Sequence, residues 1–138
     1  MTTTATLVGR SLRLIQVIDA RQPVKAADMQ TAIEALNAMV RRFEADGLAL
    51  GWQPVANPSD ELPLPPEAEE AVAYNLAVRL APEYGVDVSP VVASAAVQGM
   101  NDLLRDQMVA TPIQPLLDVP TPSERRGADL TAASWRAG

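Results

Sequence analysis

A chain of 138 residues is long enough for one domain with a core of its own, and 48% of its residues are hydrophobic. It contains no cysteine and no histidine, which excludes disulfides, thiolate chemistry and histidine-based acid–base chemistry. The net charge of -6 disfavours nucleic-acid binding through phosphate contacts. No apolar run approaches the roughly 20 residues that span a bilayer, and no cleavage site precedes Asp19, so we expect neither a membrane anchor nor a signal peptide.

A first helix is predicted near the N-terminus, where apolar residues recur at helical spacing from Leu7 to Ile18. Thr4 or Thr6 is its expected N-cap. The polar stretch DARQP, which begins at Asp19, is expected to end it.

A second helix is indicated by one apolar stripe at spacings of four and three residues: Met29, Ile33, Leu36, Val40 and Phe43. Gly47 follows it and suits a left-handed C-terminal turn. Leu48, Leu50 and Trp52 then alternate with small residues, which predicts an extended segment with one buried side that could pair as a short strand or hairpin. A polar, proline-rich loop is expected over residues 54–66.

The stretch LPLPPEAEEAVAYNLAVRLAPEYG, residues 62–85, predicts a third helix that needs cover on nearly every side. Prolines suit its first turn, and Pro82 and Gly85 are expected to close it. Its apolar arc is too wide for a helix with an ordinary solvent face: Val72, Ala73, Tyr74, Leu76, Ala77, Val78, Leu80 and Ala81. We therefore expect a central helix, or one that another subunit covers in part.

A fourth helix is expected to begin with Ser89 as N-cap and Pro90 in its first turn. Its predicted inner face contains Val92, Ala96, Gly99 and Leu103. Because Ala96 and Gly99 are small, a neighbouring backbone could approach closely there. The expected fold class is mainly α, a four-helix, bundle-like body with a short extended segment and a long extended C-terminal arm.

The arm is predicted because the helical pattern stops after Met108 and four prolines follow within eleven residues. We place the helical body at residues 1–109 and the arm at residues 110–138. A solvated linker rarely contains so many apolar residues, so we expect the arm to dock on a partner. The expected contact residues are Ile113, Leu116, Leu117, Arg125, Arg126, Trp135 and Arg136. For Trp135, an incidental tryptophan in a solvated terminus is the alternative.

Candidate catalytic residues are few. Glu67 and Glu70 share one face of the third helix, but a solvated helix start explains them better than a carboxylate pair or a cation site. The serines at positions 11, 94 and 134 have no histidine to activate them. Trp52 is expected to anchor a core or loop. The sequence therefore predicts no catalytic residue, no cofactor and no metal.

Two segments together, LNAMVRRFEADGLALGW and the stretch at residues 62–85, resemble the head-to-tail adaptor proteins of tailed bacteriophages. The group most similar is the packaged-DNA-stabilisation, or tail accessory factor, family of short-tailed phages and gene transfer agents. The resemblance covers residues 12–108, and an extended C-terminal arm is a feature of that family.

The resemblance implies a structural virion protein at the head-tail junction. It would form a dodecameric ring under the portal, extend the DNA channel, stabilise packaged DNA and provide a platform for tail attachment. Its implied partners are the portal protein, neighbouring adaptor subunits, a tail or nozzle protein, and double-stranded DNA that passes without sequence-specific binding, with no membrane. The alternatives are a peptidoglycan-degrading activity in the same virion protein and a free-standing helical protein-binding module.

Overall fold

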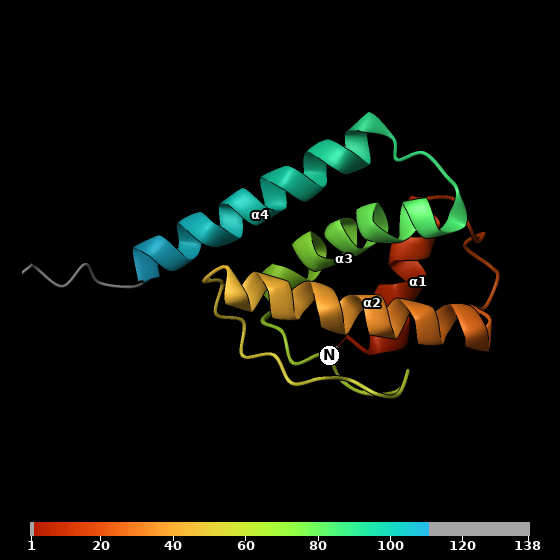
Figure 1. The fold of residues 1–138 in the computed structure, drawn as a ribbon, viewed down its shortest axis with the longest axis horizontal. Coiled ribbons are helices and arrows are strands. Elements are labelled where there is room, and N and C mark those ends of the chain that lie inside the picture. The colour runs from red at the N-terminus through yellow and green to blue at the C-terminus, as the bar shows by residue number, and fades with distance from the viewer. Residues whose placement is uncertain (1, 111–138) are drawn as a thin grey trace, which may run out of the picture.

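The computed structural model describes residues 2–110, with side chains described through Gln107. They form α1 (Thr4–Leu14), α2 (Ala26–Ala45), α3 (Pro66–Leu80), a short 3-10 helix η1 (Ala81–Tyr84) and α4 (Pro90–Ala110). The expected mainly α, four-helix body is confirmed. Figure 1 shows α3 between α2 and α4, with α1 crossing behind them.

The helix α3 is central because the other three helices all contact it. Val72, Leu76, Ala77 and Leu80 are completely buried within this single chain. The fold itself therefore covers most of the wide apolar arc predicted from the sequence, while Tyr74 and Val78 remain partly exposed. Pro66 occupies the first turn as expected, and Gly85 ends η1 in the left-handed conformation.

The predicted close approach between α3 and α4 is also present. A Cβ added at Gly99 would lie 2.9 Å from the Cβ and 3.1 Å from the Cα of Ala71 on α3. Beside this contact the Asn75 side-chain amide donates to the carbonyl oxygens of Ala71, at 2.7 Å, and Ala96, at 3.0 Å. Small residues and one amide thus hold the two backbones together. The expected N-cap of α4 is confirmed by a 3.3 Å bond from Val92 N to Ser89 Oγ.

The first helix differs from the sequence prediction at both ends. Thr3, not Thr4 or Thr6, is the N-cap, and its hydroxyl accepts from Thr6 N. The helix also ends at Leu14 instead of continuing to Asp19. Val17 N donates to Leu12 O and Gln16 N donates to Arg13 O, with Gln16 at φ 60. This is a Schellman turn with glutamine where glycine is usual, which is why the sequence did not indicate it.

The N-terminus of α1 is held by the loop that precedes α3. Thr4 N donates to Asp60 O and Ala5 N donates to Pro58 O, each at 2.9 Å, so loop carbonyls satisfy two of the free helix-end donors. The Asp60 carboxylate accepts from the backbone N–H groups of Asn57 and Ala56. These bonds lower the pKa of Asp60 and hold the turn that presents the two carbonyls.

The extended segment after α2 is fixed by side chains rather than by a strand partner. Leu48, Leu50 and Trp52 are buried as predicted, but residues 2–110 contain no strand, only an isolated bridge between Thr3 and Glu61. Asn37 Oδ1 accepts from Trp52 Nε1 at 3.2 Å and from Val55 N at 3.0 Å. Trp52 is therefore a core anchor, as the sequence indicated.

A prediction follows from the α3–α4 contact. Alanine normally stabilises a helix relative to glycine by about 0.5–1 kcal/mol. At Gly99 the new methyl group would collide with Ala71, so we expect Gly99→Ala to destabilise the protein by about 1–3 kcal/mol instead. Urea denaturation followed by circular dichroism measures the change.

Gly9→Ala is the matched control, because its added Cβ would meet only the flexible end of Arg13, at 3.3 Å, and Val24, at 4.0 Å. We expect this variant to be unchanged or slightly more stable. Equal stability of the Gly99 and Gly9 variants would contradict the close helix contact.

The turn at Gln16 gives a second prediction. A non-glycine residue in the left-handed region is strained, so Gln16→Gly should stabilise the protein by up to about 1 kcal/mol. Gln30→Gly, inside α2, should instead destabilise it by about 1 kcal/mol. The same denaturation measurement compares the two, and a loss of stability in both variants would show that the end of α1 is placed wrongly.

Candidate interaction surface

The outer face of α4 is the most distinctive surface of the described body. All three large apolar side chains that are markedly exposed in residues 2–107 belong to this helix: Val91 at 76%, Val97 at 63% and Leu104 at 41%. The helix packs on α3 along its inner face, which includes the buried residues Val92, Ala96 and Leu103. No described element covers the opposite side, so α4 has apolar residues on both faces.

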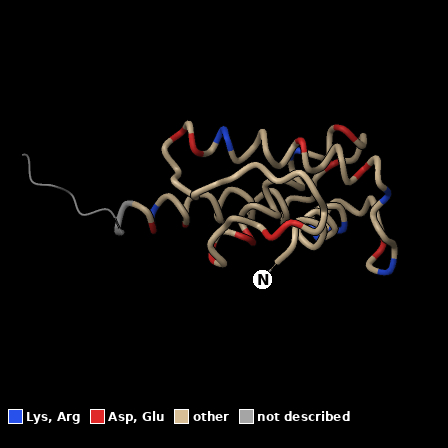
Figure 2. The backbone as a smooth tube through the Cα atoms, turned by 90° about the horizontal axis from the view of Figure 1, so that it is seen from below, with Lys and Arg blue, Asp and Glu red and all other residues tan. Residues whose placement is uncertain are grey.

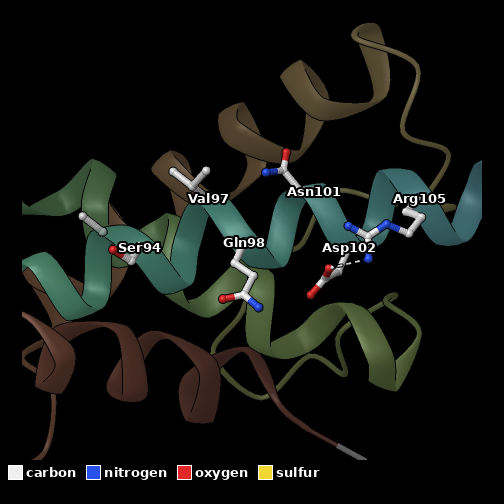
Figure 3. Close-up of a pocket in the computed structure, with 7 residues that line it drawn as sticks. Ser94, Val97, Gln98, Asn101, Asp102 and Arg105 are labelled. Carbon is white, nitrogen blue, oxygen red and sulfur yellow. Dashed lines mark ion pairs between the residues drawn. The ribbon is translucent and has the colours of Figure 1, made fainter.

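A broad open hollow of about 570 Å³ lies along this outer face. Figure 3 shows Val97 and Asn101 on one side of the helix and Gln98 and Asp102 on the other. Asp102 pairs with Arg105 across one turn at 3.5 Å, so the two charges largely balance each other. A shallow, nearly neutral surface of this kind suits another protein surface better than a small ligand, which needs an enclosing pocket.

The sequence pattern did not predict this surface. It indicated only the inner face of α4 and the contacts expected in the arm. The seven arm residues Ile113, Leu116, Leu117, Arg125, Arg126, Trp135 and Arg136 lie outside the described residues. The presence of valine or leucine on both faces of one predicted helix was the available indication, because an amphipathic helix normally keeps one face polar.

The acidic start of α3 is occupied by structural contacts. Glu70 lies 3.6 Å from Arg10, whose guanidinium also lies 5.7 Å from the ring centre of Tyr74. Glu69 accepts a 2.7 Å hydrogen bond from the Thr2 hydroxyl, while Glu67 is exposed. Within residues 2–110 no group of three or more acidic side chains is arranged to hold a metal ion.

Of the three serines considered above, Ser11 and Ser94 lie in the described residues, and both lack the surroundings of a nucleophile. Ser11 is buried between α1 and α3, and its hydroxyl lies 3.0 Å from both Leu7 O and Ala73 O, toward which it donates. Ser94 is exposed on the outer face of α4.

In the described part of the chain, no helix is long and apolar enough to cross a membrane.

Comparison with known families agrees with a structural rather than a catalytic arrangement. A family model described as P22 tail accessory factor matches residues 1–137. The chain belongs to this family. A search of curated proteins found no match. Membership in the tail accessory factor family assigns the chain a structural, virion-associated role in a tailed bacteriophage and indicates that it interacts with other virion proteins.

A third prediction addresses catalysis directly. Glu67→Gln and Glu70→Gln should leave the fold and any virion assembly intact, because helix-start carboxylates contribute only about 0.3–1 kcal/mol and the Arg10 pair is largely exposed. Peptidoglycan zymography of the two variants beside the unsubstituted chain measures lytic activity. Activity in the unsubstituted chain that either variant loses, with its circular dichroism unchanged, would support the enzyme alternative.

Proposed function

We propose that this tail accessory factor is a head-to-tail adaptor that forms a dodecameric ring under the portal. In that position it extends the DNA channel, stabilises packaged DNA and provides the platform on which a tail or nozzle protein attaches. The family match over residues 1–137 is the observation that supports the proposal most strongly. The body adds support because its one prominent unpartnered surface, the outer face of α4, suits a protein partner.

The charge of the chain is consistent with DNA passage. The net charge is -6, and double-stranded DNA is strongly anionic, so a ring of such subunits would repel the DNA rather than hold it. Figure 2 shows acidic positions on both sides of the body, not gathered on one face. The repulsion is therefore a property of the whole subunit, and no described patch suits sequence-specific contact with DNA.

We further propose that the arm, residues 110–138, attaches the body to the portal or to an adjacent adaptor subunit. The aliphatic residues Ile113, Leu116 and Leu117 would fill apolar grooves, and Arg125, Arg126 and Arg136 would pair with acids of the partner. Trp135 would be the terminal anchor, since tryptophan in a partner pocket contributes much of the binding energy in many interfaces.

A fourth prediction tests this attachment. A chain truncated after Val109 should keep nearly the same helical circular dichroism, because the buried core of the described body lies between Leu7 and Leu103. It should nevertheless lose stable binding to the isolated cognate portal. Trp135→Ala alone should weaken binding by about 2 kcal/mol or more.

Binding is measured by titrating portal with each chain, and electron microscopy of the mixtures tests for a symmetric ring. Phe43→Leu is a useful control, since it alters a buried aromatic residue of the body and leaves the arm intact. Equal affinity of the full and truncated chains would contradict the docking role of the arm, and full-length chain that never forms rings on portal would contradict the adaptor function.

A further inference from the structure

One surface of the described body lacks a partner. Ala93, Val97, Met100 and Leu104 follow one another along α4 at intervals of four, three and four residues, so they form a single stripe. Val97 and Leu104 are well exposed, while Ala93 and Met100 are partly buried at its edge. We refer to these four residues as the α4 stripe. A stripe at this spacing is what a helix presents to a second protein segment.

The geometry of a ring restricts what can cover the α4 stripe. In a closed ring of identical subunits, each interface joins one surface of a subunit to a different surface of the next. Apart from Val91, also on α4, residues 2–107 have no other large apolar side chain that is markedly exposed. The α4 stripe of one copy therefore has no counterpart, outside α4 itself, among the markedly exposed large apolar residues of its neighbour's described body.

A further set of apolar residues lies in the 28 residues that follow Ala110. Among them, residues 113–119 have the sequence IQPLLDV, with Ile113, Leu116, Leu117 and Val119. Seven extended residues reach about 23 Å, enough to cover the roughly 16 Å between Ala93 and Leu104 on a helix. Asp118 is the only charge in this segment, and Arg105, beside the α4 stripe, pairs with Asp102 but keeps 73% of its side chain exposed.

We propose that residues 113–119 of one copy pack on the α4 stripe of the neighbouring copy. This inference rests on the proposed ring and assigns the contact that joins its subunits. Docking onto the same copy is less favourable because only Thr111 and Pro112 separate α4 from Ile113. The chain would have to reverse within these two residues, which include neither glycine nor asparagine, and proline disfavours the helical conformation of the residue before it.

The absence of cysteine from the sequence permits a direct test by cross-linking. Full-length Leu104→Cys chain is mixed with full-length Leu116→Cys chain under mild oxidation, with and without portal. Mixed disulfides should form at least about tenfold faster than in a control mixture of Gln30→Cys and Leu116→Cys chains, because docking raises the local concentration of the two thiols. Gln30 is a suitable control since it is exposed on α2, away from the α4 stripe.

Each other outcome overturns the inference. A double variant, Leu104→Cys with Leu116→Cys, that closes a disulfide within one chain would show docking onto the same copy. Leu104→Cys chains that join mainly to one another would show that two α4 stripes pair directly. No preference over the Gln30 mixture, with or without portal, would show that the two surfaces do not meet.

The result is separable from that of the proposed function. Electron microscopy of the unsubstituted chain with portal tests the ring, and cross-linking tests which surfaces of two copies touch. Rings on portal without preferred cross-linking would overturn only this contact. Preferred cross-linking without rings would support the contact and count against the adaptor function.

Discussion

The close contact between α3 and α4 is the constraint on which the described body depends. Gly99 brings α4 so near to Ala71 that an added methyl group would have no room, and Asn75 joins the two backbones beside it. Because α4 meets α3 through small residues, α3 is covered closely on the one side that α1 and α2 do not reach. The same arrangement leaves α4 at the edge of the body, where no described element packs on its outer face.

The ends of the helices show how far local sequence can predict a fold. At Gly47 and Gly85 the positive φ was indicated by glycine itself, and both turns have the same bonding, with Leu48 N donating to Phe43 O and Val86 N to Ala81 O. At Gln16 the same turn is made by a residue with no preference for it. Burial of Leu12 and Ile15 against the core outweighs the local strain there, and such a tertiary effect has no local sequence pattern.

The apolar faces were predicted more successfully than the surface that suits a partner. The stripe of α2 and most of the arc of α3 are buried as expected, because periodicity indicates which residues share a face that must leave water. For α4, the spacing shows that Val97 and Leu104 share one face of the helix. It does not show that this face stays exposed, because exposure depends on whether another helix packs against it. The extended segment was located from its alternation, whereas its anchoring by Asn37 depends on residues 15 and 18 positions apart.

The buried polar groups and the exposed apolar residues of the described body have different roles. Every buried side-chain nitrogen or oxygen described has a hydrogen-bond partner, and Ser11, Asn37 and Asn75 are each used to join one segment to another. Burial and the Asp28 carboxylate raise the pKa of Tyr84 to about 12, so its hydroxyl remains a structural donor to Asp28 even in moderately alkaline solution. The buried polar groups of the described body thus serve to join its segments. The exposed apolar residues on α4 are different, because covering apolar surface lowers the free energy of the system, and such surface commonly marks a site of contact with another protein.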